Sequence, residues 1–581
     1  MNFSKLFVYF LLISAALFYS CGGNKNNQKE GRLAKGNVYY GGVFRINEND
    51  EFKSLYPLNI TEVVSQRIAN QIYEGLVKLS QSDLTVVPAL AEKWEKNNDA
   101  TVWTFKLRKG VKFQDDSCFS GGKGREVTAK DFKYCFDKLC EANAQNQAFP
   151  STFKERVAGA DEYYQSTVDK KPLAEGVKGV KVIDEYTLQI NLSYPFAGFL
   201  NILATPGCWV YPKEAFDKYG IDMRAKCVGT GPFMVKNMRE GDNVILERNP
   251  NYWGVDENDN QLPYLDYVKF TFVKEKKSEF LEFKKGNLDM VFRLPVEMIP
   301  EILGNIDHAR DRKTEFDIQI VPALSVFFYG FQHQSNVFDK KEVRQAFNYA
   351  IDRDKIVNYT LQGEGIAGIY GIVPPAFKEY DCKKIKGYSF DPDKARSLLA
   401  KAGYVKGNGF PKITLQTNSG GGDRNIQVAE IIQKMLKENL NVDVDINVMP
   451  WAEHIQSFEM GKALFWRETW TADFPDPETF LNLFYSKNIP SDPNGVSYMN
   501  SMRYRSAKFD SLFSSALREV DNKKRFELYR EADQVAIDDA VIMPVFYDEN
   551  YRLVHRNVKN FPANAMEYRD LSKVYLEPVK K

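Results

Sequence analysis

The sequence predicts a mixed α/β fold, either α/β or α+β, because strand-like and helix-like segments alternate along the whole chain. Trp103, Phe105 and Leu107 alternate with polar residues, as the buried face of a strand does. Residues 343–350 carry apolar side chains at i, i+3, i+4 and i+7, which is the spacing of one helix face. The chain has 581 residues, of which 44% are hydrophobic. This composition allows about two to four domains with cores of their own.

The first 20 residues have the pattern of a secretory signal peptide. Lys5 precedes an apolar run at 6–19 that is too short to cross a bilayer as a helix. The run ends in Ser20 and Cys21 followed by two glycines. This ending resembles the lipobox of bacterial lipoproteins, although Phe18 stands where Leu is usual. We expect the signal peptide to be removed and Cys21 to carry a lipid. An ordinary secretory signal with an incidental cysteine is the alternative.

Residues 21–36 are expected to form a lipid-anchored tether, because they are polar, rich in Asn, Lys and Gly, and cannot bury apolar area. No further apolar run in the sequence has the length that spans a membrane. We therefore expect a monomeric globular body at the bacterial cell envelope, exposed to the periplasm or the cell exterior. The formal net charge is +1 at pH 7, so no basic excess favours nucleic acid as a partner.

Further elements are expected along the body. Alternating apolar residues predict strands at 188–192 and 442–448. A helix is predicted near 391–403, with Asp391 as its N-cap, Pro392 at its first position and Gly403 just past its end. Another helix is expected around 428–435, directly before the strand at 442–448.

Six cysteines remain once Cys21 is assigned to a lipid, and export makes disulfides permissible. The pairs closest in sequence are Cys208 with Cys227 and Cys118 with Cys140. Unpaired buried thiols are the alternative, and spacing alone does not decide between the two.

No metal ion or other cofactor is predicted. The four His residues are too far apart in sequence for a local zinc motif. Residues 443–447 imitate the first ligands of a calcium loop, but Val448 and His454 occupy the positions that need Gly and Glu. The acids at 443–447 are better explained as the solvent-facing side of a strand.

The sequence does not indicate an enzyme, since it contains no GxSxG, HExxH or GxxxxGK[ST] motif. The strongest catalytic candidates are Asp473, Asp476 and Glu478, because paired carboxylates serve glycosidases. Pro475 and Pro477 make this loop rigid. Rigid carboxylates equally suit the recognition of a fixed cation.

The body carries a series of motifs in a constant order. Residues 54–57 read SLYP, 71–76 read QIYEGL and 103–113 read WTFKLRKGVKF. These segments resemble the N-terminal signature of the family 5 extracellular solute-binding proteins, which are the oligopeptide, dipeptide and nickel receptors of ABC importers. The resemblance covers nearly all of residues 40–581. The further matching segments are 87–94, 127–132, 229–233, 247–253, 343–353 and 470–477.

The resemblance implies a periplasmic-binding-protein-like Venus flytrap, in which two lobes joined by a hinge close on a ligand and the larger lobe carries an extra domain. Its connectivity is discontinuous, because the chain leaves the first lobe and returns to it. The implied segments are 37–78 for the first part of lobe I, 79–215 for the extra domain, 216–322 for the second part of lobe I, 323–545 for lobe II and 546–581 for the return to lobe I.

The resemblance also implies a function: capture of di- to oligopeptides and their delivery to the permease of an ABC importer. In the peptide receptors of this family, an Asp before the Asp-Pro turn accepts the α-ammonium of the ligand, and Asp473 matches that position. The other positions that the resemblance assigns to the ligand site are Trp470, Arg467, Trp451, Tyr547 and Val63, of which Arg467 matches an Arg that meets the carboxylate of a short peptide.

Two alternatives stay open at this point. Nickel chelates, haem and oligosaccharides bind to the same scaffold in other members of the family, so a non-peptide solute is possible. A surface lipoprotein that acts without a permease is the other alternative. The sequence does not specify the ligand's identity or length, the membrane that holds the anchor, or the permease.

Overall fold

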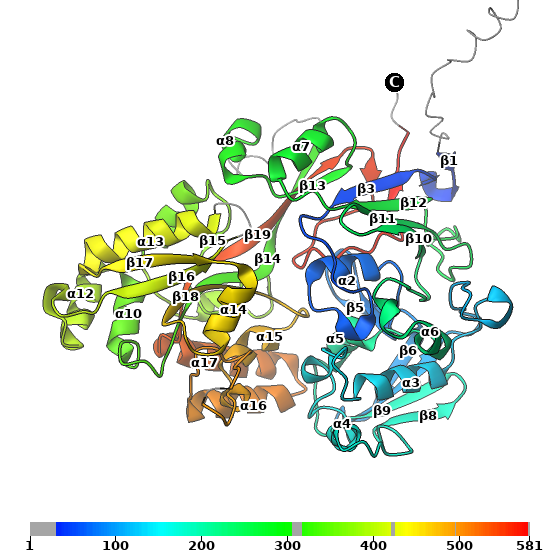
Figure 1. Cartoon of the computed structure of the whole chain (residues 1–581), viewed down its shortest axis with the longest axis horizontal. Helices are drawn as coiled ribbons and strands as arrows, with labels where there is room; N and C mark the ends of the chain where they lie inside the picture. Colours follow the sequence, from blue (N-terminus) through cyan, green and yellow to red (C-terminus); the bar gives the residue numbers. More distant parts are fainter. Residues whose placement is uncertain (1–30, 305–315, 420–423, 494, 579–581) are drawn as a thin grey trace, which may run out of the picture.

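Two bodies joined by a pair of long strands make up the molecule (Figure 1). The computed structural model describes residues 31–304, 316–419, 424–493 and 495–578, with the side chain of Val296 left out. The predicted signal peptide, Cys21 and the tether up to residue 30 lie outside the described residues. The alternation of helices and strands confirms the mixed α/β class.

The first body is built on one large sheet and is called the large-sheet body below. The strand order is β13-β19-β14-β18-β16-β17, with β15 paired to β19. The two longest strands, β14 and β19, pair along most of their length. The bounds are β13 Met290–Phe292, β14 Phe316–Phe331, β15 Ile366–Ala367, β16 Ile413–Asn418, β17 Val444–Met449, β18 Phe465–Thr471 and β19 Ile542–His555.

Helices cover this sheet, and the predicted ones are among them. In α12, Asp391 accepts a hydrogen bond from the Lys394 amide at 2.9 Å and Pro392 is the first helical residue, which confirms the predicted cap. The predicted strand at 442–448 is β17, where Asp445 and Asn447 face solvent. The bounds of the main helices are α10 Lys341–Tyr349, α12 Pro392–Lys401, α13 Arg424–Leu440, α14 Trp451–Glu459, α15 Glu478–Leu481, α16 Ala507–Arg518 and α17 Asn522–Asp538.

The second body contains two four-stranded sheets and is called the two-sheet body. One sheet has the order β10-β11-β12-β3 and the other β6-β7-β9-β8. The second sheet includes two of the three strands that alternation predicted: 103–107 lies in β7 and 188–192 corresponds to β9, which ends at Asn191. The strands are β3 Val43–Asn47, β6 Ala91–Lys96, β7 Val102–Leu107, β8 Val180–Asp184, β9 Thr187–Asn191, β10 Phe233–Arg239, β11 Asn243–Arg248 and β12 Tyr267–Thr271; the helices beside them are α2 Val63–Ala69, α3 Ala129–Leu139, α4 Ala160–Val168, α5 Phe199–Leu203 and α6 Lys213–Tyr219.

Strands β14 and β19 run from one body into the other (Figure 1). Their register shifts between Pro322 and Val326, so regular pairing is interrupted in the middle of the pair. The predicted boundary between lobe I and lobe II, 322/323, falls on this interruption. The smaller elements are β1 Arg32–Leu33, β2 Tyr39–Tyr40, β4 Val77–Leu79, β5 Val86–Pro88, β20 Val558–Lys559, β21 Tyr575–Leu576, α7 Lys276–Lys284, α8 Ile299–Ile302 and α11 Arg353–Lys355.

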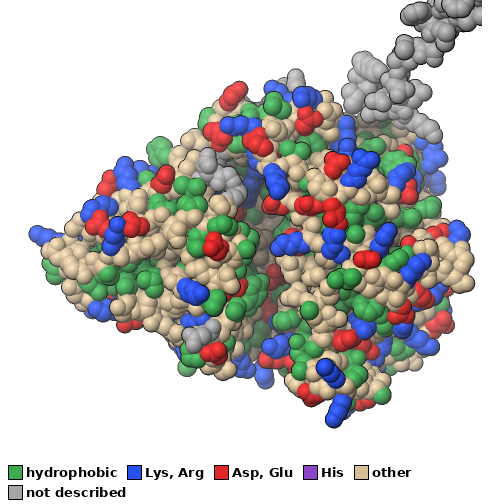
Figure 2. Space-filling model, in the orientation of Figure 1, with side chains coloured by type: hydrophobic (Ala, Val, Ile, Leu, Met, Phe, Trp, Pro, Cys, Tyr) green, Lys and Arg blue, Asp and Glu red, His purple; other side chains and the backbone are tan. Residues whose placement is uncertain are grey.

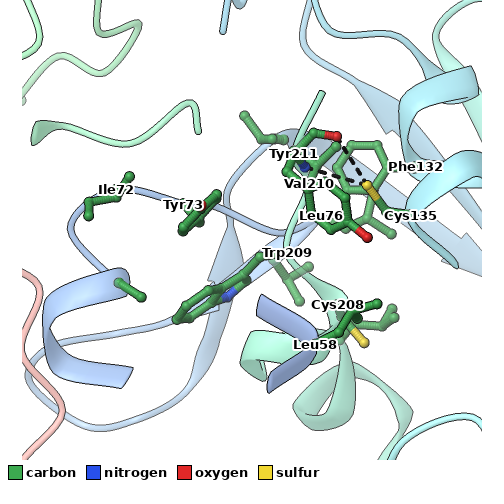
Figure 3. Packing of buried hydrophobic residues seen from close by; sticks show 14 of the residues in the cluster. Leu58, Ile72, Tyr73, Leu76, Phe132, Cys135, Cys208, Trp209, Val210 and Tyr211 are labelled. Carbon is green, nitrogen blue, oxygen red and sulfur yellow. Dashed lines mark hydrogen bonds between the residues drawn. The ribbon is translucent and has the colours of Figure 1, made fainter. Parts of the chain in front are cut away.

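The six cysteines in the described part are free thiols, so the pairings of Cys208 with Cys227 and of Cys118 with Cys140 do not form. Their sulfur atoms are used in packing instead. Figure 3 shows Cys135 in the core of the two-sheet body, where its Sγ accepts a hydrogen bond from the Tyr211 amide at 3.4 Å. Burial raises the pKa of this thiol far above its usual value, so it stays protonated.

Within the described ranges, no helix is both long enough and apolar enough to cross a membrane.

Candidate functional site

A deep groove separates the two bodies (Figure 2). Helix α2 borders it on the two-sheet body, while β18 and α14 belong to the large-sheet body opposite (Figure 1). Val63 is the first residue of α2 and is 45% exposed. The groove is therefore lined by elements that lie hundreds of residues apart in the sequence.

One edge of β18 forms main-chain pairs with a neighbouring strand over only part of its length. Along its other edge the whole strand pairs with β14, from Phe465 to Thr471. On the side of β16, pairing is limited to Phe465 and Trp466. The Ala472 amide donates to the Leu324 carbonyl of the β14 side at 2.9 Å. Because an antiparallel ladder alternates with a period of two, the peptide groups of Thr469 and Thr471 face away from β14, toward the unpaired edge.

His454 ends this open edge. Its Nε2 lies 2.8 Å from the Arg467 carbonyl oxygen and its Nδ1 lies 2.9 Å from the Gln416 amide nitrogen. A carbonyl can only accept, so Nε2 carries the proton and Nδ1 accepts from Gln416. Burial lowers the pKa of His454 to about 4, which keeps the ring neutral. The open edge thus begins after Arg467.

Asp473 stands two residues beyond the end of β18. Its side chain is exposed, and yet the protein around it raises its pKa to about 6, mainly by restricting hydration of the charge. Glu478 also raises this pKa, while a hydrogen bond from Thr479 lowers it. Asp473 is therefore a carboxylate that solvent reaches but whose charged form its surroundings disfavour. No described Lys or Arg forms an ion pair with it.

Thr479 connects Asp473 to Trp470 and was not found from the sequence. Its Oγ1 accepts hydrogen bonds from the Asp473 amide at 3.2 Å and from Trp470 Nε1 at 3.4 Å. It also donates weakly to Asp473 Oδ2 at 3.5 Å. Trp470 is 9% exposed, so its ring is largely packed. The predicted neighbours Trp470 and Asp473 are therefore brought together through a third residue.

Arg467 lies at the other end of β18 and is half-buried. Its Nη1 donates to Asn418 Oδ1 at 3.0 Å, and its guanidinium lies 4.7 Å from the centre of the Phe327 ring. Burial lowers the pKa of Arg467 to about 10, so the group stays charged at neutral pH. Its Nε is buried without a hydrogen-bond partner, and no carboxylate in the described part pairs with it. It is a charge that a carboxylate ligand can satisfy.

The remaining predicted residues differ in position. Trp451 is the first residue of α14 and is 47% exposed, with its ring 5.8 Å from that of His454. Tyr547 is fully buried in the core of the large-sheet body, and its hydroxyl donates to the Gly371 carbonyl at 2.6 Å. The position of Tyr547 in the chain suggested that its side chain borders the groove. Instead, the pleat of β19 points this side chain into the core.

Two further residues near Asp473 were missed. Tyr498 is 60% exposed, and its ring centre lies 6.4 Å from that of Trp470. Glu468 is buried on β18 and accepts a hydrogen bond from Trp466 Nε1 at 3.1 Å; burial raises its pKa to about 7. A charged residue between two tryptophans in a strand was a signal for Glu468, whereas Tyr498 lies in a loop without a pattern.

These features define a binding protein with two bodies and a groove whose walls offer an open strand edge, an unpaired carboxylate and an unpaired guanidinium. Residues 85–492 match the bacterial extracellular solute-binding proteins, family 5. The chain belongs to this family, whose members bind solutes for transporters.

Similar proteins have names that refer to peptides. The chain is 28% identical over 515 residues to the periplasmic oligopeptide-binding protein OppA of Salmonella typhimurium, covering 87% of each. It is 28% identical over 561 residues to the dipeptide-binding protein DppE of Bacillus subtilis, covering 95% of each. Among solved structures, the periplasmic binding protein DppA of Helicobacter pylori in complex with the peptide STSA has a TM-score of 0.74 at 26% identity, over 93% of this chain and 99% of that one.

Proposed function

We propose that this protein is the substrate-binding component of an ABC importer and captures peptides between its two bodies. The single observation that carries this proposal is the open edge of β18, which ends next to the unpaired carboxylate of Asp473. All peptides share a backbone and an α-ammonium. An extended peptide can add to an exposed strand edge through main-chain hydrogen bonds, which hold it without reading its sequence. The names of the relatives OppA and DppE support the same class of ligand.

In this proposal the bound peptide has a direction. Its ammonium lies at Asp473, past the C-terminal end of β18, and its backbone continues toward Arg467. The peptide strand therefore runs antiparallel to β18, and its first peptide groups pair with Thr471 and Thr469. Arg467 then binds the carboxylate of a peptide that is short enough to end beside it. Side chains of the ligand alternate between the two bodies.

Further parts of the proposal rest on the family and the sequence. A permease takes the peptide from the closed form, and the protein performs no catalysis. Cys21 anchors the mature protein to a membrane of the cell envelope, since the residues around it have the lipobox pattern. In this arrangement the polar residues between Cys21 and β1, which begins at Arg32, let the body reach the permease while it remains attached.

Native mass spectrometry of protein purified from its host tests the ligand class. A set of peptide masses supports the proposal, whereas a single non-peptide mass contradicts it. Calorimetry with matched peptides then tests the ammonium site. The free peptide should bind and its N-acetylated form should not, because acetylation removes the charge that Asp473 satisfies. Equal affinity for both forms would remove Asp473 from the binding site.

The anchor has a separate test. Cys21→Ser should move the protein from the detergent phase to the aqueous phase. An unchanged partition would contradict lipidation at Cys21.

A further inference from the structure

The loop that carries Asp473 touches both bodies. Ala472, directly before Asp473, packs in the hydrophobic core of the large-sheet body. Phe474, directly after it, is 6% exposed and belongs to the hydrophobic core of the two-sheet body. The proposed ammonium site is therefore the point at which the chain passes from one packed surface to the other.

An ion pair between the bodies holds the same loop. Arg156, which lies between α3 and α4 of the two-sheet body, places its Nη2 2.9 Å from Oε1 of Glu478, the first residue of α15. The two side chains are 13% and 2% exposed. Arg156 is oriented by its own body: its Nη1 donates to the Thr152 carbonyl at 3.3 Å and its guanidinium lies 5.4 Å from the centre of the Phe196 ring.

The pair is incompletely satisfied. Arg156 Nε and Glu478 Oε2 are both buried without a hydrogen-bond partner in the described part of the protein. A buried ion pair gains little net free energy when some of its polar atoms stay unpaired, because both charges lose their water. If the bodies separate, both groups regain water. Such a contact suits an interface that forms and breaks reversibly.

The loop is fastened independently to its own body. Asp476 accepts hydrogen bonds from the Glu478 amide at 3.0 Å and from Arg525 Nη1 at 2.7 Å. Arg525 lies in α17 and both partners are almost fully buried. The segment from Asp473 to Glu478 is thus rigid on the side of the large-sheet body, and any displacement of Glu478 by Arg156 moves the loop as a unit.

We propose that Arg156 is a positioning residue of the two-sheet body, which clamps the Asp473 loop through Glu478 when the groove closes and so slows release of the ligand. This role rests on the proposed function, because it requires that the ligand is held at Asp473. The segment that contains Arg156, the predicted extra domain, would then act as a lock on the closed form in addition to enlarging the lobe.

Stopped-flow dissociation and hydrogen–deuterium exchange test the clamp, with trialanine and tetra-alanine as probes. Arg156→Gln leaves the Glu478 charge buried and unpaired in the closed form only, so ligand dissociation should accelerate about tenfold to hundredfold. The association rate and the melting temperature of the ligand-free protein should stay near the wild-type values. In the peptide complex, amide exchange at 478–481 should also become faster, because the clamp no longer holds α15 in the closed form.

Two further variants separate a clamp from ordinary packing. The double variant Arg156→Gln/Glu478→Gln removes both charges and should return dissociation to within about threefold of wild type, as coupled residues do in a double-mutant cycle. Arg156→Lys should rescue most of the effect. The matched control is Lys213→Gln, which removes an exposed ion pair with Asp217 within α6 of the same body. It should change neither the dissociation rate nor the amide exchange at 478–481.

The outcomes are distinct. If Arg156→Gln changes dissociation by less than twofold, or lowers the melting temperature of the ligand-free protein as much as that of the complex, the clamp is wrong and the pair is simple packing. Faster exchange at 478–481 with unchanged dissociation also overturns it. If wild-type protein binds neither peptide, the proposed function fails and the clamp fails with it, which differs from the case in which peptide binds and Arg156→Gln leaves its dissociation unchanged.

Discussion

Three carboxylates within six residues of one loop differ in their ion-pair partners. Asp476 is 2% exposed, pairs with Arg525 and accepts the Glu478 amide. Glu478 pairs with Arg156 of the opposite body. Asp473 is exposed, and no described basic side chain pairs with it. The difference teaches that the unpaired member is the one available to a ligand, while its neighbours hold the loop in place.

The largest expected effect separates Asp473 from its neighbours. Asp473→Asn should weaken peptide binding about 100- to 1000-fold, because closure buries the ligand ammonium without its counter-charge. The melting temperature of the ligand-free protein should hardly change, since the carboxylate has no described basic partner to lose and its hydrogen bond from Thr479 is long, at 3.5 Å. Calorimetry and thermal unfolding measure the two quantities. A large loss of stability with unchanged affinity would reverse the roles assigned to Asp473 and Asp476.

Asp476→Asn should show the opposite pattern. Arg525 would keep a buried charge without a partner, which lowers the free energy of unfolding by about 3 kcal/mol. Affinity should fall less than in Asp473→Asn, and only through disorder of the loop. Thermal unfolding of the ligand-free protein is the measurement. Unchanged stability would show that the pair with Arg525 does not anchor the loop.

The raised pKa of Asp473, about 6, predicts that peptide binding depends on pH. An ammonium binds the ionised carboxylate, so the complex has a lower pKa for this group than the free protein. Affinity is therefore full above pH 6 and falls as pH drops through 6, by up to about tenfold per pH unit below it. Above about pH 8 it should fall again as the α-ammonium of the peptide loses its proton. Asp473→Asn should flatten the acidic limb, and an acidic limb that persists in this variant would assign it to another group.

The smallest expected effect is that of Thr479→Ala. This change removes the hydroxyl that joins Trp470 to the Asp473 backbone, and a neutral hydrogen bond contributes about 1 kcal/mol. Peptide affinity should fall about threefold to tenfold, while Thr479→Ser, which keeps the hydroxyl, should stay close to wild type. An equal loss in both variants would indicate that the methyl group of Thr479 matters and not its hydrogen bonds.

The sequence predicted which site residues lie close together where the signal is local. Trp470 and Asp473 lie close together because they are three residues apart around a strand end, and Thr479 joins them. It failed where orientation depends on the whole sheet. Tyr547 follows an apolar stretch that gives no alternation, so its side chain could face either the groove or the core. The open edge of β18 was also not predictable, because it depends on where β16 stops pairing.

The sequence by itself determined the class of fold, the cap of α12, the family and the candidate Asp473, because alternation, capping residues and motifs are local patterns. Only the tertiary structure decided which acid of the loop stays unpaired. Arg525 is 49 residues from Asp476, and Arg156 is 322 residues from Glu478. Partners so far apart are selected by how the two bodies pack, since whether a charge is paired depends on contacts in space and not on its neighbours along the chain.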